Sequence, residues 1–110
     1  MKLQTVALAI ATVLTLAQSA EANECKVINI IQQRAELVGF NYKKSATEAA
    51  FAGRDSSYYN EMAERYQAVA NLNNAYMEDK GCEYVRTKPT AVEAFMADEA
   101  IKKLDKMLQR

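Results

Sequence analysis

The sequence predicts a small all-α protein, a three-helix bundle in which a long antiparallel helical hairpin is closed by a disulfide and followed by a C-terminal helix. Three observations support this prediction. Apolar residues recur at intervals of three and four over most of the chain. Glycine and proline are scarce, with three and one among 110 residues, which disfavours a turn-rich sheet protein. The only two cysteines, Cys25 and Cys82, bracket the predicted hairpin.

The first 22 residues have the pattern of a secretory signal peptide. Lys2 supplies the initial positive charge, an apolar run covers 6–16, and Ala20 and Ala22 are small residues of the kind that signal peptidases recognise. We expect cleavage after Ala22, which leaves one helical domain over 23–110. The apolar run is shorter than the ~20 residues of a spanning helix, so we expect no stable membrane insertion after cleavage. The predicted location is the periplasm or, for a secreted protein, the exterior.

The mature chain is predicted to carry no net charge. The whole sequence has 14 basic and 14 acidic side chains, and residues 1–22 contain one of each, Lys2 and Glu21. Binding to nucleic acid or to an anionic membrane requires a basic face, so we expect neither partner. A domain of this size has a small core, and a disulfide is a common source of stability for small exported chains.

The first helix is predicted over about 24–52. Gly39 inside it, and the capping-box spacing of Ser45 and Glu48, leave open a kink or a restart near 39–45. One face of this helix carries the main apolar stripe: Ile28, Ile31, Ala35, Val38, Tyr42, Ala46 and Ala49.

A second apolar stripe lies well round the same helix and consists of Ile30, Leu37, Phe40 and Phe51. If the third helix covers this stripe, it belongs to the core. If the stripe stays exposed, it is a surface for a partner protein, because contiguous exposed apolar side chains usually mark interaction sites. We therefore take these four residues as candidate partner-binding residues.

The second helix is predicted over about 57–80, after a break in which Gly53 ends one helix and Asp55 or Ser56 caps the next. Gly81 follows as the expected terminating residue. The apolar face of this helix consists of Tyr59, Met62, Tyr66, Val69, Asn73 and Tyr76.

The spacing of the cysteines predicts that they bond to each other within one chain. At 1.5 Å per residue, the arms from Cys25 to Gly53 and from Ser56 to Cys82 are each roughly 40 Å long. Folding equal arms back on one another brings the two cysteines together, so an intermolecular disulfide is the less favoured arrangement.

The third helix is predicted over about 90–109, because Thr90 and Glu93 have the spacing of a capping box after Pro89. Two charged pairs at i,i+4, Asp98 with Lys102 and Glu99 with Lys103, are interpreted as a solvated face. The apolar face consists of Ala97, Ala100, Ile101, Leu104, Met107 and Leu108.

Tyrosines and one asparagine are the remaining suggestive residues. Four of the six tyrosines lie on predicted apolar faces and are interpreted as residues at the edge of the core. Tyr58, near a turn, and Tyr84, in a connector, are candidates for contact with a partner. Asn73 lies within an apolar face, where an unpaired amide costs on the order of 1–3 kcal/mol. We expect a local partner for it; the alternative is that this face lines a groove or an oligomer interface.

The sequence lacks several residue types and motifs of common catalytic chemistry, while its plentiful Asp and Glu residues leave carboxylate pairs open. There is no histidine, which removes the usual general base, the usual zinc and haem ligand, and imidazole-based triads. The two cysteines are far apart and do not form a Cys-x-x-Cys motif, and no glycine-rich phosphate loop is present. We therefore predict no enzymatic activity, no cofactor and no metal.

The sequence favours a non-enzymatic protein-binding module, of the inhibitor, immunity or exclusion type, that acts on another envelope or secreted protein. The alternative is a periplasmic chaperone or stress protein that uses an exposed apolar helix strip. A third interpretation is small-ligand binding inside the bundle. The identity of the partner is left open, as is the oligomeric state, with a homodimer among the options.

Overall fold

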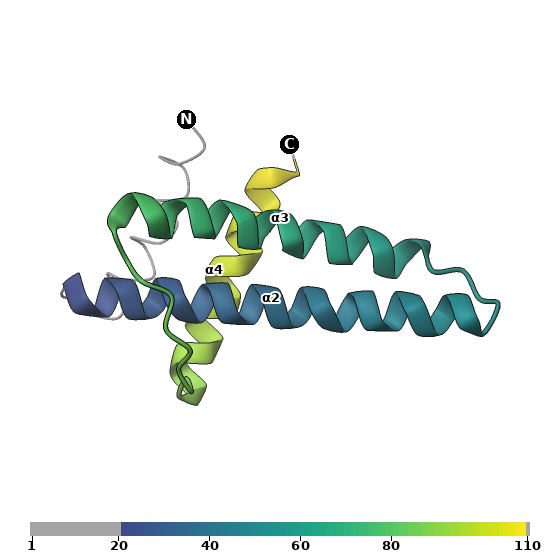
Figure 1. Ribbon diagram of the computed structural model, residues 1–110, viewed down its shortest axis with the longest axis horizontal. Helices are drawn as coiled ribbons and strands as arrows, with labels where there is room; N and C mark the ends of the chain where they lie inside the picture. Colours follow the sequence, from purple (N-terminus) through teal and green to yellow (C-terminus); the bar gives the residue numbers. More distant parts are fainter. Residues whose placement is uncertain (1–20, 110) are drawn as a thin grey trace.

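The computed structural model describes residues 21–109, and the side chains from residue 24 onward. Its helices are α2 (Glu21–Phe51), α3 (Ser57–Lys80) and α4 (Ala91–Leu108). Helices α2 and α3 form an antiparallel hairpin, and α4 crosses one face of that hairpin (Figure 1). The predicted all-α class and three-helix arrangement are confirmed. The predicted signal peptide, apart from its last two residues, lies outside the described residues.

The two ends of the hairpin are fixed in different ways. At the open end, Cys25 and Cys82 form the predicted disulfide, with their Cα atoms 5.5 Å apart. At the closed end, the chain turns through Gly53, whose φ of 72° lies in the left-handed region that favours glycine. Asp55 then accepts a hydrogen bond from the Ser57 backbone N–H at 3.0 Å, which satisfies a donor in the first turn of α3.

Helix α2 continues without a break through 39–45, so neither the kink nor the restart that the sequence left open is present. Ser45 and Glu48 lie inside the helix and do not begin a new one. Gly39 lies on the side of α2 that faces α3. A Cβ atom at this position would lie 3.4 Å from the Tyr66 Cβ, an ordinary van der Waals contact, so the space between the helices admits a methyl group here.

The main core lies toward the disulfide end of the hairpin, where all three helices meet. Asn73 is completely buried there, and its Nδ2 donates to the Ile28 carbonyl at 3.1 Å and to Gln32 Oε1 at 2.9 Å. The Asn73 amide nitrogen therefore has the local partners expected for a buried amide, whereas its Oδ1 accepts no hydrogen bond from the described residues. The apolar members of the core are Ile28, Ile30, Ile31, Ala35, Val69, Ala70, Tyr76, Met77, Ala97, Ala100, Ile101 and Leu104.

The connector between α3 and α4 is held against α2 by two amide side chains. Asn29 accepts from the Val85 N–H at 2.7 Å and donates to the Glu83 carbonyl at 3.0 Å. Gln33 likewise bonds both the N–H and the carbonyl of Thr87, at 2.5 and 2.8 Å. The spacing matches, because four helical residues rise about 6 Å and two extended residues span about 6.6 Å. The connector thereby fixes where α4 begins.

Helix α4 begins with the capping box predicted from the sequence. Thr90 Oγ1 accepts from the Glu93 N–H at 3.1 Å, and the Thr90 N–H donates to Glu93 Oε1 at 2.9 Å. The predicted pairing of Asp98 with Lys102 is absent from the described residues, although the Asp98 side chain is 39% exposed. Its carboxylate accepts two hydrogen bonds from Arg34 of α2, at 2.6 and 2.9 Å, while Lys102 pairs with Glu99. Spacing within one helix reports only neighbours on that helix, so it missed a partner on another.

Candidate protein-binding surface

The part of the hairpin over 39–65 extends beyond α4 on the side away from the disulfide, and we call it the distal arm (Figure 1). Apart from the contact of α4 with Arg65 at the base of the arm, α2 and α3 pack there as a pair. Ala46 and Ala49 are buried between them. Because two helices alone cannot bury all of their apolar side chains, large apolar residues on and next to the distal arm remain exposed.

Three residues of the second apolar stripe of α2 lie on its outer edge. Leu37, Phe40 and Phe51 are 54%, 66% and 90% exposed. We call these three residues the α2 edge. The structure removes Ile30 from this stripe, because Ile30 is only 1% exposed. Its side chain lies one helical turn from Arg34, which binds α4, and it forms part of the three-helix core.

A row of aromatic rings runs from α4 along the distal arm. Phe95 of α4, Val38 and Tyr66 line a hollow of about 290 Å³ between α4 and the hairpin. Tyr66 stacks on Tyr42 with ring centroids 5.7 Å apart, and Tyr42 meets Tyr58 edge to face at 6.2 Å. Phe95 and Tyr58, at the two ends of the row, are 64% and 59% exposed. We call these five residues the aromatic corner.

The aromatic corner is neutral at its centre. The hydrogen bond with Tyr58 is the main cause of a raised pKa for Tyr42, and burial raises the pKa of Tyr66. Both phenols therefore stay protonated at physiological pH. Rings of this kind offer a large apolar contact area together with hydroxyl groups that form directional hydrogen bonds.

Phe95 is the main residue of this surface that the sequence analysis missed. A signal for it exists in the sequence, because on a helical wheel Phe95 lies nearly opposite the apolar face formed by Ala97, Ala100, Ile101 and Leu104. A large aromatic residue on the polar side of an amphipathic helix is a candidate for contact with another molecule.

A second hollow, of about 400 Å³, lies between α2 and α3 beside Phe40. Gly39 and Ala63 are the small residues that line it, and Lys43 and Glu64 are also part of its wall. No ion pair joins either of these charged residues to another residue in the described part of the chain. The hollow is therefore bounded by the exposed Phe40 ring and by charged groups that are available to a partner.

Tyr84 is separate from the other candidates. It is 46% exposed and lies on the connector, which crosses α2 on the disulfide side of the distal arm (Figure 1). The structure thus brings Tyr58 into the aromatic corner, leaves Leu37, Phe40 and Phe51 along the α2 edge, and does not place Tyr84 with either group.

The described residues show no arrangement for metal binding or membrane insertion. Over 24–109, no group of three or more acidic or cysteine side chains is placed to hold a metal ion. None of the described helices is long and apolar enough to cross a membrane. No protein-family model, no curated protein and no solved structure matches this chain. The geometry of its surface is therefore the basis for assigning a function.

Proposed function

We propose that this chain is a small exported protein-binding module that acts on another envelope or secreted protein, as an inhibitor, immunity or exclusion protein does. The observation that carries the proposal is the aromatic corner, where Phe95 and Tyr58 remain more than half exposed on a rigid frame. Aromatic side chains are enriched in protein interfaces and often dominate their binding energy. The Cys25–Cys82 bond is compatible with an oxidising compartment, which supports the exported location.

The arrangement of the hairpin and α4 is rigid, which suits a surface that is already formed before a partner protein binds. The disulfide, the buried Asn73 contacts and the connector bonds hold the hairpin and α4 in one arrangement. A pre-organised surface loses little conformational entropy when it meets a partner. We infer that the aromatic corner provides the central contact and the α2 edge a flanking one.

The test is site-specific photo-crosslinking in the native host. A photoreactive residue at Phe95 is expected to trap one defined protein, whereas the same residue at Asn74, an exposed position on α3, traps none. With the trapped protein purified, the double variant Phe95→Ser with Tyr58→Ser should weaken binding by at least about tenfold. The matched control is Val85→Ser, which removes an exposed apolar side chain from the connector. Equal effects of the two changes, or no crosslink at Phe95, would contradict the proposal.

A chaperone or stress protein is the second candidate, and the exposure of the α2 edge is the observation that favours it. An exposed apolar strip binds unfolded chains without strict sequence preference. Phe40→Ser with Phe51→Ser should then abolish suppression of aggregation of a model client, whereas the aromatic-corner variant should not. If this protein suppresses no aggregation at any pH between acid and neutral, the chaperone function is ruled out.

A further inference from the structure

The ion pairs that hold α4 on the hairpin all have their charges arranged in the same way. Three ion pairs among the described residues join α4 to the hairpin, and in each of them the acid belongs to α4 and the base to α2 or α3. They are Lys26–Glu93, Arg34–Asp98 and Arg65–Asp105.

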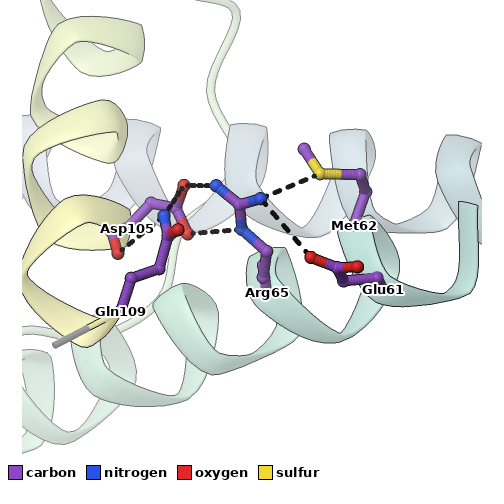
Figure 2. A network of polar contacts seen from close by, with 5 residues as sticks. All are labelled: Glu61, Met62, Arg65, Asp105 and Gln109. Carbon is purple, nitrogen blue, oxygen red and sulfur yellow. Dashed lines mark hydrogen bonds and ion pairs between the residues drawn. The ribbon is translucent and has the colours of Figure 1, made fainter. Parts of the chain in front are cut away.

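The pair between α3 and α4 is the most enclosed of the three. Arg65 donates from Nη2 and Nε to the two oxygens of Asp105, at 2.6 and 3.2 Å, and the Asp105 side chain is only 15% exposed (Figure 2). Gln109 donates to the same carboxylate at 3.0 Å, and Glu61 lies 3.9 Å from the other side of the guanidinium. A bidentate pair of this kind fixes orientation as well as distance.

The other charged and titratable groups around these acids can be named from each helix. Glu93 faces Lys26 of α2 and the Thr90 backbone. Asp98 faces Arg34 of α2. From α3, Tyr66 is the neighbour of both Asp98 and Asp105, and its pKa is raised by burial, so it is uncharged at acid and neutral pH. Acidification therefore changes the charge of the carboxylates alone.

Helix α4 makes apolar contact with the hairpin through the buried Ala97, Ala100, Ile101 and Leu104, and the core also packs against the partly buried Met96, Met107 and Leu108. Among the described residues three ion pairs join α4 to the hairpin, whereas one, Lys80–Glu24, joins α2 to α3. On α2, Ile30 lies one helical turn from Lys26 and one helical turn from Arg34. It therefore lies between the two residues of α2 that form ion pairs with α4. The docking of α4 consequently depends on its charged contacts more than the pairing of α2 with α3 does.

The hairpin is held together by contacts that acid does not remove. The Cys25–Cys82 bond is covalent, and Asn73 bonds to Ile28 and Gln32 through neutral groups. The ion pair of Lys80 with Glu24 lies beside the disulfide, so its loss leaves that end closed.

We propose that α4 is an acid-released strap: in acid its ion pairs with Lys26, Arg34 and Arg65 are lost, and it separates from a hairpin that the disulfide keeps closed. Release uncovers Ile30 on the hairpin together with Ile101 and Leu104 on α4. The connector bonds from Asn29 and Gln33 are between neutral groups, so they tether α4 after it leaves. This inference does not depend on the proposed function, because it concerns the fold alone.

The direction of the pH effect follows from the ion pairs. Hydrogen bonds from the Thr90 backbone and from Lys26 lower the pKa of Glu93 below its usual value. The Thr90 bond lies within the cap of α4 itself, so only the contribution of Lys26 stabilises docking to the hairpin. That contribution is present above the unfolded pKa and is lost as the pH falls through the lower folded value. Carboxyl groups in proteins titrate around pH 4, so release belongs to the acid range and not to the range near pH 6.

The experiment is an acid titration of the whole oxidised protein followed by two-dimensional amide NMR. We expect the signals of α4 to move to unfolded positions at a higher pH than those of α2 and α3, with dye binding to apolar surface rising in the same step. Simultaneous loss of all three helices, or an α4 that keeps its folded signals down to about pH 2, would overturn the proposal.

A pair of variants with equal charge change isolates the ion pairs. Asp98→Asn with Asp105→Asn should raise the midpoint for α4 release by at least one pH unit or release α4 already at neutral pH. Glu48→Gln with Glu64→Gln removes the same number of charges at positions that form no ion pair in the described residues, and it should leave the midpoint in place. Equal shifts in both would show that net charge, and not these contacts, controls α4.

Salt provides a test that needs no variant. About 0.5 M sodium chloride screens partly exposed ion pairs, so the release midpoint of the unmodified protein should move to higher pH. A midpoint that salt leaves unchanged, or moves to lower pH, contradicts a strap held by ion pairs.

Discussion

Neighbouring acidic residues of α4 have different roles because each meets a different partner. Asp98 accepts two hydrogen bonds from Arg34 of another helix, whereas Glu99 pairs with Lys102 on its own helix. An exposed pair within one helix contributes at most about 0.5 kcal/mol. A bidentate arginine–carboxylate pair between helices is stronger and also fixes their relative orientation. At the scale of single residues, the position of α4 is thus decided by a few side-chain contacts.

Glu93 gives the most direct measurement of one such contact. Its pKa is lowered first by the hydrogen bond from the Thr90 backbone and then by Lys26. We expect NMR titration of the Glu93 side chain to give a pKa below the usual 4.5. Lys26→Met should raise that pKa only part of the way, because the Thr90 bond remains. A Glu93 that titrates at or above its usual value in the folded protein would show that the capping box does not persist in solution.

At the scale of helices, Gly39 and Gly81 differ in their backbone conformation. Gly39 lies inside α2 with helical geometry, and a methyl group there meets Tyr66 at an ordinary contact distance of 3.4 Å. Gly81 ends α3 with φ at 74°, and its N–H bonds to the Glu78 carbonyl at 3.1 Å. The first position tolerates alanine, and the second requires a left-handed conformation that residues with a Cβ adopt at a cost.

Alanine substitutions at these two positions should therefore have opposite signs. Gly39→Ala should raise the free energy of unfolding by up to about 1 kcal/mol, because glycine weakens a helix interior. Gly81→Ala should lower it by about 1 kcal/mol, because a left-handed alanine is strained. Urea unfolding followed by circular dichroism measures both. Destabilisation by Gly39→Ala would mean that the helices approach one another more closely at Tyr66 than the structure shows.

At the scale of the whole molecule, the disulfide and α4 act on the same end of the hairpin. The bond between Cys25 and Cys82 spans a sequence separation of 57 residues, and α4 crosses the half of the hairpin nearer to its open end (Figure 1). The distal arm, in contrast, is held by α2–α3 packing, with Arg65 at its base bonded to Asp105 of α4. Stability is thus concentrated at one end, whereas Phe40, Phe51 and Tyr58 are exposed at the other.

Removal of the disulfide should lower the stability of the protein strongly. In the chain-entropy model, a loop of this length corresponds to roughly 4 kcal/mol, a large fraction of the stability of a small domain. We expect Cys25→Ala with Cys82→Ala, or the reduced protein, to unfold at a much lower urea concentration. Equal unfolding midpoints for the oxidised and reduced forms would show that helix packing alone holds the hairpin.

The sequence by itself determined the helices and the pairing of the cysteines. Apolar periodicity, Gly53, Gly81 and the Thr90–Glu93 capping box are local signals, and local signals are sufficient to place helix ends. Equal arm lengths were sufficient to bring Cys25 and Cys82 together.

The tertiary structure alone decided which apolar residues stay exposed. Ile30 and Leu37 belong to one stripe of α2, yet α4 crosses at Ile30 and leaves Leu37 in solvent. Phe95 and the pairing of Asp98 with Arg34 depend equally on where α4 lies. That position is set by Asn29, Gln33 and the interhelical ion pairs of α4. The partners in these contacts are 40 to 67 residues apart in the sequence. Periodicity within one helix carries no information about contacts at such separations, so only the folded chain defines the candidate surface.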